Sequence, residues 1–253
     1  MVTSLFFGLT ASIFFANSTT FGLESIWLNC SSSVMSFDDS NFLSGYLRNL
    51  IYLYKVLAVD PKDVNILTNK GNIFDTLGKH QEAMQYYDKA LALEPNDVIA
   101  LEDKGSALDL LGKYHEAIIY YDKALTLDPR NVDVLYNKGV SLGKLGNHTQ
   151  AIQYYDKALA LEPNYIGALM GKGFALHQLG NNNQAIVYYD KALAIDPANA
   201  DTLTNKGFAL AALHKYNEAI KYYDKSLAIK PNLKDAIIGK RLSLEALNQT
   251  QIK

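Results

Sequence analysis

The sequence predicts an all-α fold in which antiparallel helix pairs stack side by side as an α-solenoid with a 34-residue period. Every proline falls on one spacing of 34 residues, and a glycine, an alanine and a Tyr-Tyr-Asp-Lys block recur at the same interval. A fixed period of this length indicates a repeat architecture, because each unit buries its apolar face only against its neighbours. The prolines are Pro61, Pro95, Pro129, Pro163, Pro197 and Pro231.

The first half of each unit is expected to be a helix. In the second full unit, Leu101, Gly105, Leu108 and Leu111 are spaced so that they share one helical face. Gly112 follows them, and glycine at this place typically ends a helix in the left-handed conformation. We therefore expect a first helix of about three turns that stops at this glycine.

The second half of each unit is expected to be another helix. Residues 114–125 carry an apolar stripe, and Asp128 precedes Pro129. The residue before a proline avoids helical geometry, so the second helix should end there. Asn or Asp follows every proline within two residues, as in Asn96 and Asp97, and these side chains are good N-caps for the next helix.

The recurring glycines lie inside the first helices, where each should cost about 1 kcal/mol relative to alanine. We expect close helix packing to offset that cost, because glycine on one helix and alanine on its neighbour let the backbones approach, with tyrosine beside them filling the remaining volume. The Asp and Lys of each Tyr-Tyr-Asp-Lys block are expected to form a solvated outer face. The glycines are Gly71, Gly105, Gly139, Gly173 and Gly207.

The pattern Leu-x-x-Lys-Gly-x-x-Leu, followed by Tyr-x-x-Ala-x-x-x-Tyr-x-x-Ala and a closing proline, resembles the tetratricopeptide repeat. Leucine stands where the family often has tryptophan, lysine always precedes the glycine, and His214 replaces the glycine between helices in the fifth unit. The resemblance implies a right-handed superhelix whose first helices line an inner groove for peptide segments. The five predicted units are 64–97, 98–131, 132–165, 166–199 and 200–233.

Incomplete units are predicted at both ends of the array. Residues 46–63 align with a second helix and are expected to form a degenerate half-repeat. Residues 234–253 align with a first helix, with Arg241 in the glycine place and Glu245 one turn later. Because the terminal units of a solenoid need a polar outer face, this segment is predicted to be a C-terminal capping helix.

Residues 1–45 form an apolar segment of low charge, possessing no Lys or Arg. The apolar run from Leu5 to Ala16 is too short for a membrane-spanning helix, which needs roughly 20 apolar residues. Its length suits a signal peptide, but the cationic flank is missing. An export signal, a weakly ordered apolar leader and a start at Met35 all remain open.

The predicted partner site follows from the positions that flank each repeated glycine. The first two full units place polar and acidic residues there, including Asp75 and Asp109, whereas later units place apolar ones. We expect an apolar docking stretch with an acidic mouth, suited to a peptide with apolar anchors and a basic end. The candidate groove residues are Asn69, Asn72, Glu102, Asp103, Tyr136, Asn137, Val140, Met170, Phe174, His177, Asn205, Phe208 and Leu242.

Two interpretations of the later units compete. Phe174 and Phe208 either anchor a partner, as aromatic side chains in grooves often do, or pack between neighbouring first helices. The asparagines two places before the glycine, Asn69, Asn137 and Asn205, resemble the inner surface of the repeats in O-GlcNAc transferases, but only alternate units carry them. A co-chaperone clamp is not expected, because Thr68 occupies the place where that site has lysine.

Composition and motifs exclude most other functions. The net charge is −2 with no block of like charge, which argues against nucleic-acid binding. Cys30 is the only cysteine, so a disulfide framework and a multi-cysteine metal site are excluded. Catalytic residues, cofactors and metals are predicted to be absent, since no Walker loop, HExxH or nucleophile elbow occurs. Four histidines are placed in turns, and His177 is placed alone in the groove.

The sequence thus predicts a non-enzymatic scaffold that binds another protein or a peptide in its concave groove. Self-association as a structural protein is one alternative. Another is an exported or membrane-tethered adaptor that contacts the membrane through residues 1–34. A cytoplasmic location is expected if that segment is neither a signal nor an anchor.

Overall fold

The computed structural model describes residues 62–251, all of which belong to the second of two units into which the chain divides, Leu53–Lys253. The predicted N-terminal segment 1–45 and nearly all of the predicted half-repeat 46–63 lie outside the described residues. The helices are α4 (Val64–Thr76), α5 (His80–Leu93), α6 (Val98–Leu110), α7 (Tyr114–Leu127), α8 (Val132–Lys144), α9 (His148–Leu161), α10 (Ile166–Gln178), α11 (Asn182–Ile195), α12 (Ala200–Ala212), α13 (Tyr216–Ile229) and α14 (Lys234–Gln251).

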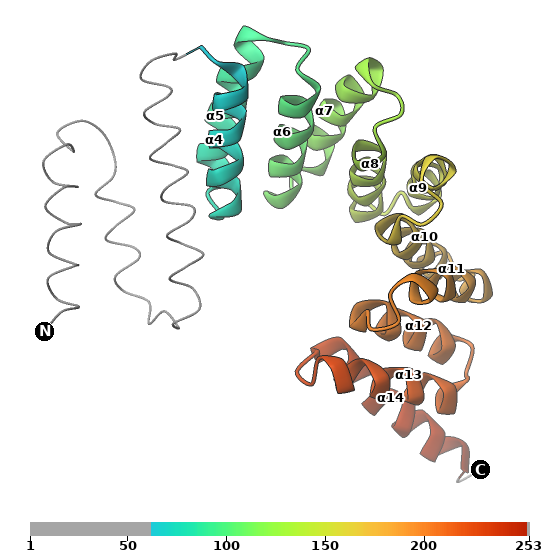
Figure 1. Cartoon of the computed structure of the whole chain (residues 1–253). Coiled ribbons are helices and arrows are strands. Elements are labelled where there is room, and N and C mark those ends of the chain that lie inside the picture. Colours follow the sequence, from blue (N-terminus) through green and yellow to red (C-terminus); the bar gives the residue numbers. More distant parts are fainter. Residues whose placement is uncertain (1–61, 252–253) are drawn as a thin grey trace, which may run out of the picture. The chain divides into compact units, whose positions relative to one another are not determined.

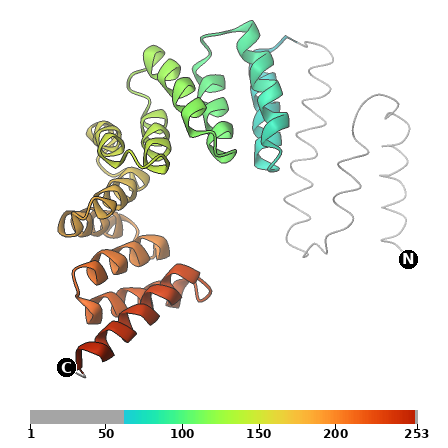
Figure 2. The same cartoon turned by 180° about the vertical axis from the view of Figure 1, so that it is seen from behind.

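The described helices form consecutive antiparallel pairs that follow one another along an arc (Figure 1). Each first helix packs on its own second helix and on the neighbouring first helices. The view from behind shows the same succession from α4 to α14, with no return of the chain to an earlier pair (Figure 2). The predicted all-α solenoid of stacked helix pairs is confirmed for residues 62–251.

The helix starts follow from the residues after each proline. Asp97 and Asn131 are N-caps whose side chains accept a hydrogen bond from the backbone N–H three residues later, at 3.0 Å in both cases. Asn199 caps α12 in the same way, at 2.9 Å. The fourth unit departs from this pattern, because Tyr165 occupies the cap position of α10 and makes no side-chain cap bond. Its hydroxyl instead donates to Asp133 at 2.8 Å.

The turns inside the units require a left-handed residue. Gly112 and the corresponding glycines of the first four units have φ of 75° to 80°. His214 takes the same conformation in the fifth unit, with φ of 60°. Glycine adopts this region without steric cost, whereas histidine is strained there.

Each mid-helix glycine faces the ring of the second tyrosine in its own unit. A Cβ built on Gly105 would lie 2.5 Å from Cε1 of Tyr121, and the same contact recurs at Gly139 with Tyr155, at 2.6 Å. The expected tyrosine beside the glycine is therefore present, and its ring occupies the space that a Cβ would need. Alanines such as Ala117 are fully buried between the paired helices, but the bulky neighbour that requires glycine is tyrosine.

From the second full unit to the fifth, the lysine before the glycine ties three helices together. Lys138 of α8 is 6% exposed; its ammonium pairs with Asp122 of the preceding unit and donates to the Tyr154 hydroxyl at 2.7 Å. The ring of Tyr154 also lies between two ammonium groups, those of Lys138 at 4.3 Å and Lys157 at 4.7 Å from its centroid. The Tyr-Tyr-Asp-Lys block is thus an inter-repeat joint, not only the solvated face that was expected.

The last helix continues this joint. Lys240 of α14 pairs with Asp224 of α13 at 2.6 Å. Arg241 and Glu245 are exposed, as a solvating cap requires. The same helix also exposes apolar side chains, so its outer face is less polar than predicted. These are Ile237, Ile238, Leu242 and Leu244, which are 41–52% exposed.

Candidate functional site

The first helices present the candidate site on the inner side of the arc. Figure 1 shows α6, α8 and α10 on that side, with α7, α9 and α11 behind them. Successive first helices contact each other directly, so their facing residues form one continuous surface. Helical period alone brings the positions flanking each glycine onto this surface.

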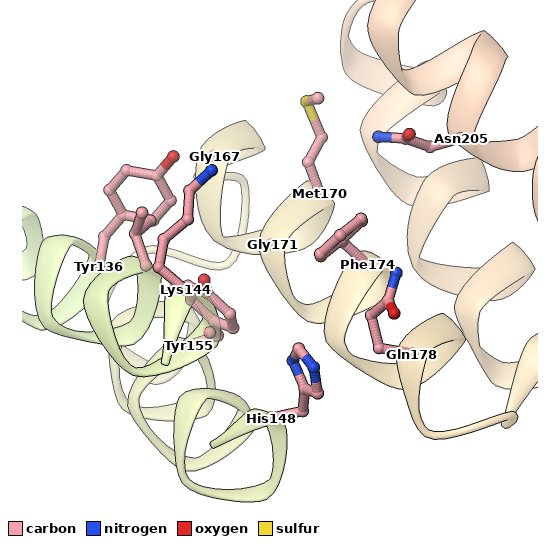
Figure 3. A pocket seen from close by; sticks show the side chains of 12 residues that line it. Tyr136, Lys144, His148, Tyr155, Gly167, Met170, Gly171, Phe174, Gln178 and Asn205 are labelled. Atoms are coloured by element: carbon pink, nitrogen blue, oxygen red, sulfur yellow. The ribbon is translucent and has the colours of Figure 1, made fainter. Parts of the chain in front are cut away.

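A pocket of about 520 Å³ opens on this surface between α8, α9 and α10 (Figure 3). Its walls bring together Tyr136 and Val140 of α8 with Met170 and Phe174 of α10. The four were among the predicted groove residues, and their meeting in one hollow depends on the stacking of the third and fourth units. A hollow lined mainly by apolar side chains with a few polar groups is the usual form of a ligand site.

Three glycines line this pocket, and two of them leave room for tyrosine rings in its wall. Gly143, Gly167 and Gly171 all line it. At Gly171 a Cβ would lie 2.7 Å from Cζ of Tyr155, and at Gly167 it would lie 3.1 Å from the ring of Tyr136. The other full units carry asparagine or aspartate at the place of Gly171. The pocket therefore exists where the third and fourth units depart from the rest of the array.

Phe174 and Phe208 occupy the same place in successive units but differ in environment. Phe174 lies in the pocket wall and is 44% exposed. Phe208 packs edge-on against Tyr223, with centroids 5.5 Å apart. The first helix that follows Phe208 carries Gly239, which leaves room beside Tyr223 for this contact. The first helix that follows Phe174 carries Asn205 at the equivalent repeat position. Phe208 therefore packs on the second helix of its own unit rather than between first helices, whereas Phe174 stays accessible in the pocket wall.

The surface of α4 and α6 is polar. Tyr87 donates its hydroxyl hydrogen to Oδ1 of Asn72 at 2.6 Å, and Asn72 in turn hydrogen-bonds to Asp103. Burial raises the pKa of Asp103 to about 6, and the negative charge of Asp75 adds to the rise. Oδ2 of Asp103 is buried without a hydrogen-bond partner among the described residues.

The other predicted carboxylates on this surface have partners. Glu102 accepts a hydrogen bond from Asn131 at 3.2 Å, although burial still raises its pKa. Asp109 accepts from the buried hydroxyl of Ser141 at 2.7 Å and from Tyr121 at 2.9 Å. Asp75 pairs with a histidine of α5 at 2.6 Å. Asp109 and Asp75 thus stabilise the array, while Asp103 keeps an unused acceptor.

The remaining predicted residues divide between surface and structure. Asn69 and Leu242 are exposed, and Asn137 is partly buried on α8. Asn205 of α12 lines the pocket. His177 was expected to face the groove alone, but its Nδ1 lies 2.6 Å from Oδ1 of Asn182, because the end of α10 lies beside the start of α11.

The sequence interpretation missed several groove residues. Lys144, His148 and Gln178 line the pocket. His148 was expected in a turn, yet it is the first residue of α9. Ile99 and Leu110 of α6 are 59% and 60% exposed and correspond in register to the pocket residues Gly167 and Lys144. Extending the examined positions by one helical turn at each end would have found those on the first helices, but not His148 on α9.

Neither a metal site nor a membrane span stands out in the described part of the chain. No group of three or more potential metal-ligating side chains occurs between residues 62 and 251. Over the same residues, no helix combines the length and apolarity needed to cross a bilayer.

Comparison with sequence families identifies the repeat. A model described as "Tetratricopeptide repeat" matches residues 64–97, 132–165 and 200–233. One described as "TPR repeat" matches 105–146 and 173–214, and a further tetratricopeptide-repeat model matches 86–119. Together the matches cover residues 64–165 and 173–233. A search of curated proteins found no match.

Solved structures with the same fold include three of similar extent. The alignment with "YrrB: a TPR protein with an unusual peptide-binding site" has 26% identity and a TM-score of 0.60, covering 75% of this chain and 97% of that one. MamA aligns with 27% identity and a TM-score of 0.58, covering 64% and 94%. PilW, a "type IV pilus biogenesis factor", aligns with 23% identity and a TM-score of 0.72, covering 79% and 93%. At that identity PilW shows the fold alone.

Proposed function

The chain belongs to the tetratricopeptide-repeat family and is a protein-interaction scaffold; we propose that it holds a peptide segment of another protein in the concave groove lined by its first helices. The role is non-enzymatic, because binding and presentation require only the groove. The peptide places an apolar anchor in the pocket between α8 and α10 and its basic part near α4 and α6.

The pocket is the observation that carries this proposal. Phe174 and Met170 lie in its wall, and Phe174 is 44% exposed in a position where a partner side chain can cover it. Covering an exposed aromatic side chain is favourable by about 25 cal/mol per Å² of apolar surface removed from water. Such anchors dominate the free energy of many interfaces.

The test uses the full chain and a library of displayed random peptides long enough to cross three units. Phe174→Ala is expected to lose at least tenfold in affinity for the enriched peptides, while its urea midpoint stays close to that of the parent chain. Phe208→Ala is the matched control: it removes a ring that packs on Tyr223, so it should lower stability more than Phe174→Ala and affinity less. Unchanged affinity in Phe174→Ala would refute the proposal.

Self-association is the second candidate, favoured by the exposed apolar side chains of α14. Ile237, Ile238, Leu242 and Leu244 lie near the end of the array without a helix over them among the described residues. Light scattering tests this candidate, because one chain has a mass of 28.1 kDa. A measured mass of twice that value, which falls to the mass of one chain in Leu242→Glu, would favour self-association.

Membrane contact through residues 1–34 and export of the chain are proposals that fall outside the described residues. Fractionation of cells with an antibody against the array would distinguish them from the cytoplasmic location that we propose.

A further inference from the structure

The rim of the pocket between α8 and α10 differs in charge from the rest of the inner surface. Lys144 is its only charged lining residue, and no carboxylate lines it. The Lys144 side chain is exposed and forms no ion pair with the residues between 62 and 251. The surface of α4 and α6, by contrast, carries Glu102 and Asp103. The inner surface is therefore electrically asymmetric along its length.

Neutral polar groups accompany Lys144 around the apolar walls. His148 has a buried Nδ1 without a hydrogen-bond partner in the described part of the chain. The amides of Gln178 and Asn205 line the pocket and make no hydrogen bond to described side chains. Figure 3 shows these groups on three sides of Phe174 and Met170. Amide and imidazole N–H groups are donors, so the rim combines one positive charge with unused donor capacity.

We propose that this pocket recognises an apolar side chain together with an adjacent aspartate or glutamate of a partner peptide, the apolar group entering between Tyr136 and Phe174 and the carboxylate lying at Lys144. The inference rests on the proposed function and specifies the partner's chemistry. A carboxylate is the group that an unpaired ammonium and nearby amide donors bind most favourably. The acidic surface of α4 and α6 repels the same group, so the two surfaces orient the peptide.

The position of the pocket indicates that the carboxylate belongs to a side chain within the peptide. α6 lies on one side of the pocket and α12 on the other, and both continue the inner surface. A peptide backbone can therefore pass beyond the pocket in either direction. A chain terminus is not required for the apolar anchor and the carboxylate to reach their places.

The experiment compares displayed random peptides enriched by the parent chain and by Lys144→Glu, Lys144→Gln and Lys221→Glu. Lys221 is an exposed lysine of α13 that does not line the pocket, so its variant matches the charge change. The parent chain should enrich peptides with Asp or Glu beside an apolar residue about two- to fivefold over neutral ones, the range that an exposed ion pair supplies. This preference should weaken as salt is added.

The variants separate charge recognition from folding. Lys144→Gln should abolish the acidic preference, Lys144→Glu should reverse it toward Lys or Arg, and Lys221→Glu should leave it intact. Lys144 lies at the end of α8, where a cation stabilises the helix, so melting temperatures are measured for all variants. If Lys144→Glu folds poorly, the loss of the acidic preference is tested with Lys144→Gln alone.

Each other outcome overturns the proposal. If the enriched peptides carry an apolar anchor without an acidic neighbour, this inference is refuted and the proposed function stands. The same holds if the acidic preference is unchanged in the Lys144 variants. Enrichment of no peptide removes both. Enrichment only of peptides ending in a free carboxylate contradicts the side-chain source. A dimer that Lys144→Glu dissociates would make a second copy the occupant instead of a peptide.

Discussion

Replacing Gly105 by alanine tests the contact that sets the spacing between paired helices. A Cβ at this position would lie 2.5, 2.9 and 3.0 Å from three ring atoms of Tyr121, where carbon atoms normally approach to about 3.5–4.0 Å. The ring is fully buried and its hydroxyl is held by Asp109 at 2.9 Å, so it cannot swing aside freely. Overpacking of this kind costs about 1–3 kcal/mol, against a gain of about 1 kcal/mol in helix propensity.

Gly143 provides the matched control, because the same substitution there meets only ordinary van der Waals contacts. Its Cβ would lie 3.9 Å from the Tyr155 hydroxyl and 4.0 Å from the nearest alanine carbon. Gly143→Ala should therefore raise the free energy of unfolding by up to about 1 kcal/mol, whereas Gly105→Ala should lower it by up to about 2 kcal/mol.

The measurement is urea unfolding followed by circular dichroism. The dependence of the unfolding free energy on urea concentration should be the same for each variant if the same surface is exposed on unfolding. A double-mutant cycle with Tyr121→Leu adds a direct test of the contact: once the ring is removed, Gly105→Ala should no longer destabilise the chain. If Gly105→Ala proves as stable as Gly143→Ala, the tyrosine ring does not explain why glycine stands in the first helices.

Four further outcomes are expected. Asp122→Asn should lower stability by about 1–2 kcal/mol in urea unfolding, because the buried ammonium of Lys138 loses its charged partner; an unchanged midpoint would show the joint to be dispensable. His214→Gly should raise the melting temperature through relief of about 1 kcal/mol of left-handed strain. Burial raises the pKa of Tyr223 to about 12, so the folded chain keeps protons that the unfolded chain releases near pH 10. Stability should therefore fall as pH rises above about 10, with phenolate absorbance and helix loss appearing together. Burial raises the pKa of Asp103 to about 6, so stability should fall as pH rises from about 4 to 6; Asp103→Asn should remove part of that slope and stabilise the chain at neutral pH by on the order of 1–2 kcal/mol.

The architecture could be predicted from the sequence because its causes are local and repeated. A proline after each second helix and a glycine or His214 between paired helices fix the turns, and each acts within a few residues of the chain. The exception is equally local: the expected cap after Pro163 failed because Tyr165, not Asn164, occupies the cap position of α10.

The candidate site could be predicted only in part, because a pocket depends on how neighbouring units combine. The sequence placed Phe174 and Phe208 in equivalent positions, but their environments differ through residues on the following first helix. The lysine–aspartate joint was missed for the same reason. Lys138 and Asp122 are 16 residues apart and belong to different units, and no pattern within one unit shows that they meet.

The distribution of repeated and variable residues indicates how one array separates stability from recognition. Glycine, tyrosine and the joint lysine recur because each contacts a partner that also recurs, so changing one disturbs an interface between helices. Some inner-surface residues also hold the array together, as Asp109 does, but exposed ones such as Phe174 contact mainly solvent, and a change there costs little stability. Gly171 shows the consequence: where the other full units carry a polar residue, it leaves room for the Tyr155 ring and lines the pocket. Specificity in this chain can therefore vary from unit to unit without altering the joints that hold the units together.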